Sequence, residues 1–279
     1  MRRSAFVSQL SATLALHVVP AFKDNYLYIL VDKETARAAF IDPGDAAPLI
    51  EIVEAFGLQP EFILLTHHHS DHTGGVQALL ERWANIELVC SPWLREKQQW
   101  QAKRLNRLSP GGAFHLWSNE VQAIDVRGHT LDHIAYLVRG TREEQGSDVF
   151  VGDALFGAGC GGLFEGTHPQ MLDALKELRR LPDAVRIWCA HEYTVKNLRV
   201  AALLQEDNPT QRERLEHLEA ILKQEALEPH ECVTVPLNLG EEKTTNPFLR
   251  WDTPTLQKAI DTSDDLATFS YVRAFRDRF

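Results

Sequence analysis

The chain has 279 residues, 44% of them hydrophobic, and a formal net charge of −10. This length allows one large domain or two smaller ones, with a core that buries about three quarters of the unfolded surface. Nucleic acid binding needs a concentrated Lys and Arg surface, so the acidic balance argues against a DNA- or RNA-binding protein. No apolar run is long enough to predict a transmembrane helix, and the segment after Met1 is expected to be an ordinary N-terminus.

The first predicted elements in chain order are strands. Apolar runs at 14–19, 26–31 and 38–41 are separated by turn-forming residues, which predicts an antiparallel meander. A helix with one apolar face follows from Pro48 to Gly57, and strands then alternate with helices. The strands predicted in this alternating part are 61–65, 87–90, 121–126, 149–151 and 185–189, and its helices are one beginning at Val76 and one at 169–181.

After Tyr193 the composition changes to long helical stretches. The helices predicted there cover 195–205, 210–226, 255–260 and 266–275. Two sheets with helices outside them, followed by a small helical domain, is the α+β architecture that this order suggests. The sequence therefore predicts one domain over residues 1–192 and a helical domain over residues 193–279.

The four cysteines are spread along the chain without a Cys-x-x-Cys pair. Such spacing provides no disulfide framework and is typical of a protein in the reducing cytosol. The cysteines therefore favour a cytoplasmic protein. The chain is also expected to be a monomer, and its charge and the lack of a long apolar run favour neither nucleic acid nor membrane binding.

Residues 63–75 read ILLTHHHSDHTGG and concentrate four histidines and one aspartate within six positions. They follow an apolar run, so they are predicted to lie in a loop at the carboxyl end of a strand, where layered α/β folds build their sites. One further histidine or aspartate follows the end of each of three other predicted strands. The candidate donors collected in this way are His67, His69, Asp71, His72, His129, Asp153 and His191.

Imidazole and carboxylate donors without a thiolate fit a divalent first-row metal, and zinc, iron or manganese could all be accommodated. Seven donors are more than one ion needs, whereas two ions that share Asp153 as a bridge would use them all. His68 alternates with His67 and His69, so it is expected to point away from them. His133 is expected to support the ligands and not to bind metal.

The ordered motifs around these donors resemble those of the metallo-β-lactamase superfamily, which implies a four-layered αββα sandwich. Further segments are similar to the glyoxalase II family, the hydroxyacylglutathione hydrolases, and this similarity spans nearly the whole chain. The segments that carry it are Asp24–Tyr26, Gly159–Gly166, His191–Thr194, Asn246–Arg250 and Arg276–Phe279.

The resemblance implies two divalent ions per chain, zinc first, with iron or manganese as alternatives. One ion would be held by His67, His69 and His129, and the other by Asp71, His72 and His191. Asp153 and a hydroxide would bridge the two ions, and Asp42 would support the metal-binding loop.

For glutathione, the resemblance implies recognition by Tyr193 and Arg250, with contacts from the segment 159–166. This chain departs from the family pattern twice within that segment. Gly162 stands where relatives often carry a basic residue, and Phe164 stands where some have tyrosine. One cationic contact and one hydroxyl contact are therefore missing.

The implied reaction is hydrolysis of the thioester of S-(2-hydroxyacyl)glutathione, typified by S-D-lactoylglutathione, to glutathione and D-lactate. It is the second step of methylglyoxal detoxification. A thiolate with a pKa of about 8.5 leaves without a general acid. Asp71 and His72 are the expected catalytic residues, and Asp71 is expected to orient the hydroxide and accept its proton. Cys160 is expected to be structural, and Arg273 and Arg276 are expected to be solvated charges.

Other activities remain as alternatives to this hydrolase. Persulfide dioxygenases share the fold and act on glutathione-linked substrates with one Fe(II), but the two complete ligand sets favour the hydrolase. A hydrolase of the same fold with another substrate is the next alternative, although the helical C-terminal part disfavours a lactonase or lactamase. The acidic charge disfavours a nuclease. A metal-binding module without enzymatic activity would have an intact metal site and no hydrolytic turnover.

Overall fold

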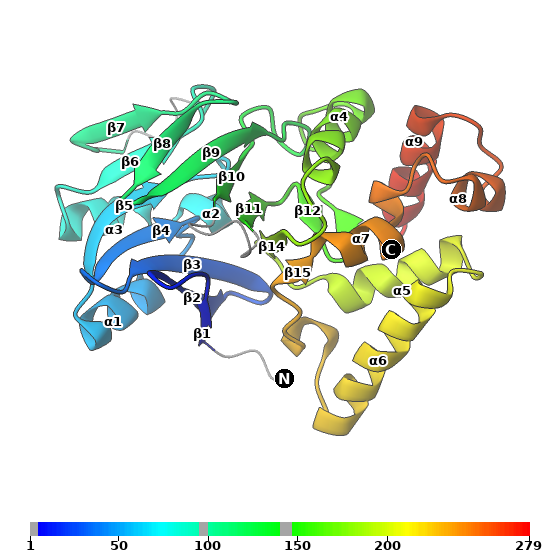
Figure 1. Cartoon of the computed structure of the whole chain (residues 1–279), viewed down its shortest axis with the longest axis horizontal. Coiled ribbons are helices and arrows are strands. Elements are labelled where there is room, and N and C mark those ends of the chain that lie inside the picture. The colour runs from blue at the N-terminus through cyan, green and yellow to red at the C-terminus, as the bar shows by residue number, and fades with distance from the viewer. Residues whose placement is uncertain (1–4, 95–99, 140–146) are drawn as a thin grey trace. The chain divides into compact units, whose positions relative to one another are not determined.

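The computed structural model describes residues 5–94, 100–139 and 147–279 (Figure 1). The described chain divides into two compact units. The N-terminal unit runs to Asp125 and takes in Asp132–Gly152, and the C-terminal unit comprises Val126–Leu131 and Asp153–Phe279. The first residues, expected to be an ordinary N-terminus, lie outside the described part. No described helix has the length and apolar character needed to cross a membrane.

A seven-stranded sheet forms the centre of the N-terminal unit, and its strands lie in chain order. They are β1 (Phe6–Gln9), β2 (Leu14–Ala21), β3 (Asn25–Asp32), β4 (Arg37–Ile41), β5 (Gln59–Leu64), β6 (Glu87–Cys90) and β7 (Arg104–Arg107). Strands β1 to β4 pair antiparallel, so the predicted meander is confirmed, and β4 to β7 pair parallel. The prediction lacks β1 and β7, because these short edge strands are partly polar and carry no apolar run.

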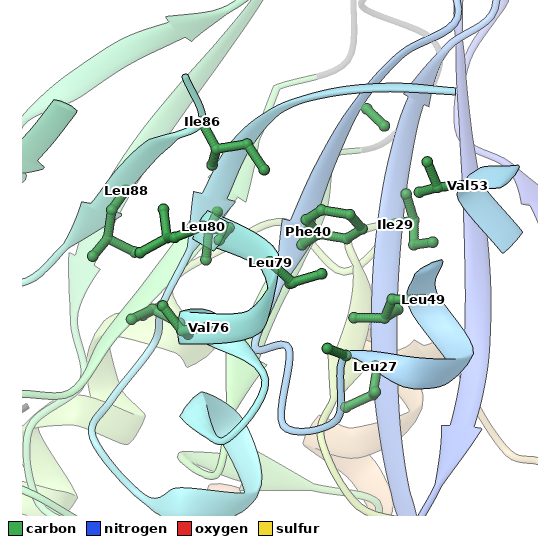
Figure 2. Packing of buried hydrophobic residues seen from close by; sticks show 14 of the residues in the cluster. Leu27, Ile29, Phe40, Leu49, Val53, Val76, Leu79, Leu80, Ile86 and Leu88 are labelled. Carbon is green, nitrogen blue, oxygen red and sulfur yellow. The ribbon is translucent and has the colours of Figure 1, made fainter. Parts of the chain in front are cut away.

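Helices α1 (Ala47–Phe56) and α3 (Val76–Arg82) cover one face of this sheet (Figure 2). Parallel strands need a crossover connection, and α1 and α3 provide those between β4 and β5 and between β5 and β6. Ile29 and Phe40 on the sheet pack with Leu49 of α1 and Leu79 of α3, and all four are fully buried. This apolar layer holds the ends of β4 and β5, and with them the loop that carries the histidines.

Replacing Ile29 by valine is expected to lower the free energy of unfolding by about 0.5–1.5 kcal/mol. Ile29 is completely buried in the cluster, so the lost methylene leaves a small void. Denaturant unfolding of the metal-free proteins measures the change. Val7→Ala on β1 is the control, because Val7 is 46% exposed and its truncation should have little effect. Equal losses of stability in the two variants would contradict this packing.

A second group of strands lies against the other face of the seven-stranded sheet. Tyr136 donates a hydrogen bond to the backbone oxygen of Leu65 at 2.8 Å, and the rings of Tyr28 and Phe150 lie 5.4 Å apart. Neighbouring strands of this group pair antiparallel. They are β8 (Ala113–Leu116), β9 (Asn119–Asp125), β10 (Ile134–Val138) and β11 (Asp148–Gly152). The N-terminal unit thus has a helix layer and two sheet layers.

The C-terminal unit is mostly helical. Its helices are α4 (His168–Arg179), α5 (Thr194–Leu204), α6 (Pro209–Glu225), α7 (Leu239–Thr245), α8 (Pro254–Ala259) and α9 (Asp265–Arg276), with short 3-10 helices at Pro229–Glu231 (η1) and Pro247–Leu249 (η2). Strand β14 (Arg186–Cys189) pairs with β15 (Leu237–Asn238), and β12 (Leu155–Phe156) pairs with β13 (Gly159–Cys160). The helices predicted at 169–181, 195–205, 210–226, 255–260 and 266–275 are all present within about two residues, whereas α7 is not among the predictions.

Candidate metal centre

The histidine-rich segment leaves the end of β5, as expected, but it is not a simple loop. Residues Ser70–Thr73 form one helical turn, α2, which the Thr73 backbone N–H closes on the His69 carbonyl at 3.1 Å. The ring of His67 lies 4.7 Å from that of His69 and 4.1 Å from that of His72. The turn therefore gathers three imidazoles that an extended chain would keep apart. We call His67, His69, Asp71 and His72 the loop donors.

Asp42 organises this segment from the end of β4. Its carboxylate, 3% exposed, accepts hydrogen bonds from the Thr66 backbone N–H at 2.8 Å and from the Thr66 hydroxyl at 2.6 Å. It also lies 3.0 Å from Nδ1 of His72. A carboxylate so engaged acts as an acceptor, so His72 carries its proton on Nδ1, and its lone pair is on Nε2.

The same reasoning applies to His67. The Thr66 hydroxyl donates to Asp42, so it accepts from Nδ1 of His67, which lies 3.0 Å away. Nε2 of His67 is then the nitrogen with the lone pair. Asp42 thus sets the tautomer of two loop donors, one directly and one through Thr66, in the way that supporting carboxylates orient metal-binding histidines.

Asp71 is held from two sides. The Asn25 side-chain amide donates to Oδ2 of Asp71 at 2.9 Å, and the same oxygen lies 3.6 Å from Nε2 of His72. Behind it, a Cβ on Gly44 would stand 1.7 Å from the backbone oxygen of Asp71, so only glycine permits this approach. Asp71 therefore has its backbone positioned by the loop after β4 and its carboxylate by the start of β3.

Replacing Asp42 by asparagine is expected to weaken metal binding by about tenfold, because supporting partners of metal ligands contribute roughly 10- to 100-fold in affinity. An amide offers one acceptor oxygen where the carboxylate offers two, so either Thr66 or His72 loses its partner. Competition with a chromophoric chelator measures the affinity. Asp45→Asn serves as the control, since the hydrogen bond that Asp45 accepts within the described chain comes from the nearby Ala47 backbone N–H and not from Thr66 or His72. An affinity equal to that of the unmodified protein would contradict the role of Asp42.

The C-terminal unit contains the other predicted donors, His129, Asp153 and His191, which we call the C-terminal donors. Oδ2 of Asp153 lies 3.3 Å from Nε2 of His129, and Oδ1 lies 3.4 Å from Nε2 of His191. All three residues are buried. One carboxylate therefore faces two imidazoles with its two separate oxygens, which is the arrangement that a bridging ligand needs.

The tautomer of His129 is also set by a partner. Its Nδ1 lies 2.7 Å from the carbonyl oxygen of Gly162, and a carbonyl can only accept, so Nδ1 carries a proton. In the neutral ring the Nε2 lone pair then faces the Asp153 carboxylate. A cation between these two electron-rich atoms would remove their repulsion, so these residues fit a bound divalent metal.

Neighbouring residues of the C-terminal unit support His191. The ring of Tyr193 stacks on it at 5.0 Å with the planes 5° apart, and Phe156 packs edge-on at 5.8 Å. Glu192 lies between His191 and Tyr193 in the sequence. Its buried carboxylate accepts hydrogen bonds from the backbone N–H and the hydroxyl of Thr234, each at 2.8 Å. Glu192 is thus an anchor for the segment before β15, and Tyr193 lies next to a predicted metal ligand.

Arg250, the predicted glutathione contact, is 8% exposed. Its Nη1 donates to Oε1 of Gln205 at 2.6 Å. Burial lowers the pKa of the guanidinium, and Asp207 raises it, but an arginine keeps its charge in proteins. Gln205, at the end of α5, thus orients a cation that the sequence suggested only as a substrate contact.

Gly162 and Phe164, the two departures from the family pattern within segment 159–166, lie in different environments. Phe164 is 74% exposed, and its ring lies edge-on to that of His129 at 5.2 Å. Gly162 contributes its backbone oxygen to His129. Asn246 holds the preceding turn by donating to the carbonyls of Phe156 and Gly159, each at 3.1 Å. At Gly162 the chain therefore offers a backbone contact to a metal ligand, with no side chain for the substrate.

Two other histidines near the loop donors have different partners. Nδ1 of His68 lies 3.0 Å from Oδ1 of Asp132, so this ring is paired with a carboxylate. His133 stacks on His67 at 4.5 Å with the planes 11° apart, which restrains the ring of a predicted ligand. Asp132 thereby has a partner that its position in the sequence does not reveal.

All four cysteines are buried and none is paired in a disulfide. Burial raises the pKa of the Cys160 thiol to about 11, although Arg273 opposes the shift. A thiol with such a pKa is almost fully protonated at neutral pH and is a poor nucleophile. The prediction of a structural Cys160 fits this environment.

Comparison with known proteins is consistent with the fold and donors described above. A model described as the metallo-beta-lactamase superfamily matches residues 24–191, and one described as the hydroxyacylglutathione hydrolase C-terminus matches residues 192–279. A hydroxyacylglutathione hydrolase from a Synechococcus species is 41% identical over 261 residues, which cover 94% of this chain and 98% of that protein. The hydroxyacylglutathione hydrolase of Trichodesmium erythraeum is 38% identical over 95% of this chain and 99% of its own length.

Solved structures show the same fold at low sequence identity. A metallo-beta-lactamase from Staphylococcus aureus superposes with a TM-score of 0.61 at 17% identity, covering 99% of this chain and 72% of that one. ETHE1 from Myxococcus xanthus superposes with a TM-score of 0.52 at 24% identity, covering 77% of this chain and 92% of that one. The α+β fold is therefore the metallo-β-lactamase fold, with a helical C-terminal region.

Its fold and its histidine and aspartate donors define a metal-dependent hydrolase of the metallo-β-lactamase superfamily. Two findings narrow this class to one family. They are the helical C-terminal region and the relatives of about 40% identity over nearly the full length. The chain belongs to the hydroxyacylglutathione hydrolase family, glyoxalase II.

Proposed function

We propose that the protein hydrolyses S-D-lactoylglutathione and related S-(2-hydroxyacyl)glutathiones to glutathione and D-lactate or the matching 2-hydroxy acid. This reaction would make it the second enzyme of methylglyoxal detoxification, acting in the cytoplasm as a monomer. The observation that carries the proposal is the Asp153 carboxylate, whose two oxygens face His129 and His191 separately. Membership in the hydroxyacylglutathione hydrolase family supports the substrate class.

The loop donors and the C-terminal donors would supply the ligands for two divalent ions, zinc first, with iron or manganese as alternatives. Seven imidazole and carboxylate donors suit two such ions, and the absence of thiolate among them keeps all three metals open. When bound, divalent ions lower the pKa of water to around 7 and polarise the carbonyl of an ester or thioester.

Asp71 and His72 would act closest to the reaction. Oδ2 of Asp71 accepts from Asn25, and the side chain is 38% exposed, so the carboxylate can meet a water molecule and accept its proton. His72 is fixed by Asp42 with its Nε2 toward Asp71. The departing glutathione thiolate has an ordinary pKa of about 8.5, so its release needs no acid from the chain.

Glutathione recognition would rest on Arg250 and Tyr193. The guanidinium of Arg250 is held by Gln205, and a charged donor held in place binds a carboxylate more strongly than a mobile one does. Gly162 and Phe164 would contribute only backbone and apolar contacts. In this proposal, residues 1–192 carry out catalysis and the second domain, residues 193–279, binds the substrate. The two adjoining family matches support this division.

The test compares two thioesters of D-lactate, one of glutathione and one of a small thiol without the glutathione peptide. The initial rate is followed by the loss of thioester absorbance. The proposal expects rapid hydrolysis of the glutathione thioester and slow hydrolysis of the other. Similar rates for both would contradict glutathione recognition by Arg250 and Tyr193. No hydrolysis of either, with oxygen consumed on addition of glutathione persulfide, would point instead to a dioxygenase.

A further inference from the structure

Arg273, on the last helix, is expected from the sequence to be a solvated charge, but the structure contradicts this expectation. The residue is 4% exposed and lies on the buried side of α9 (red in Figure 1). A charge is buried at a large cost unless it is paired and hydrogen-bonded. Its Nη2 donates to Oδ1 of Asp277 at 2.5 Å, and the guanidinium stands 5.2 Å from the ring centre of Phe248.

Nη1 of the guanidinium contacts the end of β13 and the residue that follows it. Nη1 donates to the carbonyl oxygen of Cys160 at 3.0 Å and to that of Gly161 at 3.3 Å. The next residue, Gly162, is the one whose carbonyl accepts from Nδ1 of His129 at 2.7 Å. Two consecutive carbonyls are thus bound by Arg273, and the third is bound by a predicted metal ligand.

The backbone at Gly161 lies directly against the C-terminal donors. A Cβ built on Gly161 would stand 2.0 Å from the backbone oxygen of Asp153 and 2.9 Å from Nδ1 of His129. Gly161 and Gly162 have no side chains that could anchor this segment by packing, and glycine leaves the backbone more freedom than any other residue. Hydrogen bonds to its backbone therefore hold this segment, and at residues 160–162 they are the bonds to the carbonyls from Arg273 and His129.

We propose that Arg273 is a positioning residue of the metal centre. By binding the carbonyls of Cys160 and Gly161, it places the Gly162 carbonyl where it fixes the ring and tautomer of His129. The inference rests on the proposed function in one respect, the assignment of His129 as a metal ligand.

An arginine suits this position better than a lysine. The planar guanidinium presents Nη1 to the two carbonyls and Nη2 to Asp277 at the same time, in a fixed fork. The ammonium of a lysine is a single point with a shorter reach and cannot reproduce this division. Arg273→Lys is therefore expected to retain only part of the metal affinity that Arg273→Met loses.

The test measures metal affinity by chelator competition in Arg273→Met, Arg273→Lys, Asp277→Asn and Arg276→Met. Partners that orient metal-binding histidines contribute roughly 10- to 100-fold, so Arg273→Met is expected to weaken metal binding at least about tenfold. Asp277→Asn keeps the arginine but loosens it, and a smaller change in the same direction is expected. Arg276→Met is the matched control, because Arg276 lies on the same helix and donates to Asn197 and not to the carbonyls of Cys160 and Gly161.

An unchanged metal affinity in a folded Arg273→Met protein, with only its thermal stability lowered, would overturn the proposal. Equal losses of affinity in Arg276→Met and Arg273→Met would do so as well, because they would indicate a general effect of the helix. If Arg273→Met does not fold, Asp277→Asn decides, since Asp277 is on the surface and its replacement should be tolerated. Metal affinity is measured without substrate, so failure of the unmodified protein to hydrolyse the glutathione thioester would count against the proposed function alone.

Discussion

Replacing Asp153 by asparagine is expected to lower metal content and hydrolysis of the glutathione thioester together. In the structure its two carboxylate oxygens face His129 and His191, so one substitution disturbs donors on both sides. Even a partner that only supports a ligand contributes roughly 10- to 100-fold, so loss of a shared ligand should reduce kcat/KM by more than about 100-fold. Elemental analysis of the purified protein and steady-state rates measure the two quantities.

Asparagine keeps the shape of aspartate, so the variant should fold, and circular dichroism checks that it does. Asp173→Asn on α4 is a matched control in the same unit, since the side chain of Asp173 is 75% exposed and pairs with Lys176, away from the C-terminal donors. It should retain full metal content and rate. Normal metal stoichiometry in Asp153→Asn would count against a bridging role, and a normal rate with reduced metal would show that one ion suffices.

The loop donors lie near one another because the argument that selected them is local. His67 and His69 directly precede the turn α2, Asp71 and His72 lie in it, and the place of this segment at the end of an apolar strand follows from the pattern of the strand itself. The residues that support them come from distant parts of the chain. Asn25 is 46 positions from Asp71, and their contact depends on how β3 to β5 align, which periodicity does not reveal.

Arg273 shows a different limit of prediction from the sequence, since its burial was not expected. An arginine on an amphipathic helix is usually solvated, and this general rule led to the wrong expectation. The spacing within α9 held the missing signal, since Phe269, Val272 and Arg273 follow the i, i+3, i+4 pattern of one face and all are buried. Helix α7 cannot be predicted from the periodicity of the sequence, because LGEEKTT has too few apolar residues to show any period.

Replacing Arg250 by alanine is expected to raise KM for the glutathione thioester and to leave kcat nearly unchanged. A hydrogen bond to a charged group contributes about 1.5–3 kcal/mol, which corresponds to a KM increase of roughly 10- to 150-fold. The contact would be the same in the ground state and the transition state, because the glutathione peptide is remote from the reacting carbonyl. Loss of such uniform binding changes KM and spares kcat.

The burial of Arg250 makes a control necessary, since its loss also leaves Gln205 without a partner for Oε1. The thioester that lacks the glutathione peptide provides this control, because a general defect of the fold would slow both substrates, whereas a lost contact would affect only the glutathione thioester. Gln205→Ala should raise KM less and in the same direction, because the guanidinium stays charged but loses its orientation. An unchanged KM in Arg250→Ala would exclude the arginine contact, and the buried Gln205–Arg250 pair would then serve only to join α5 to the segment after η2.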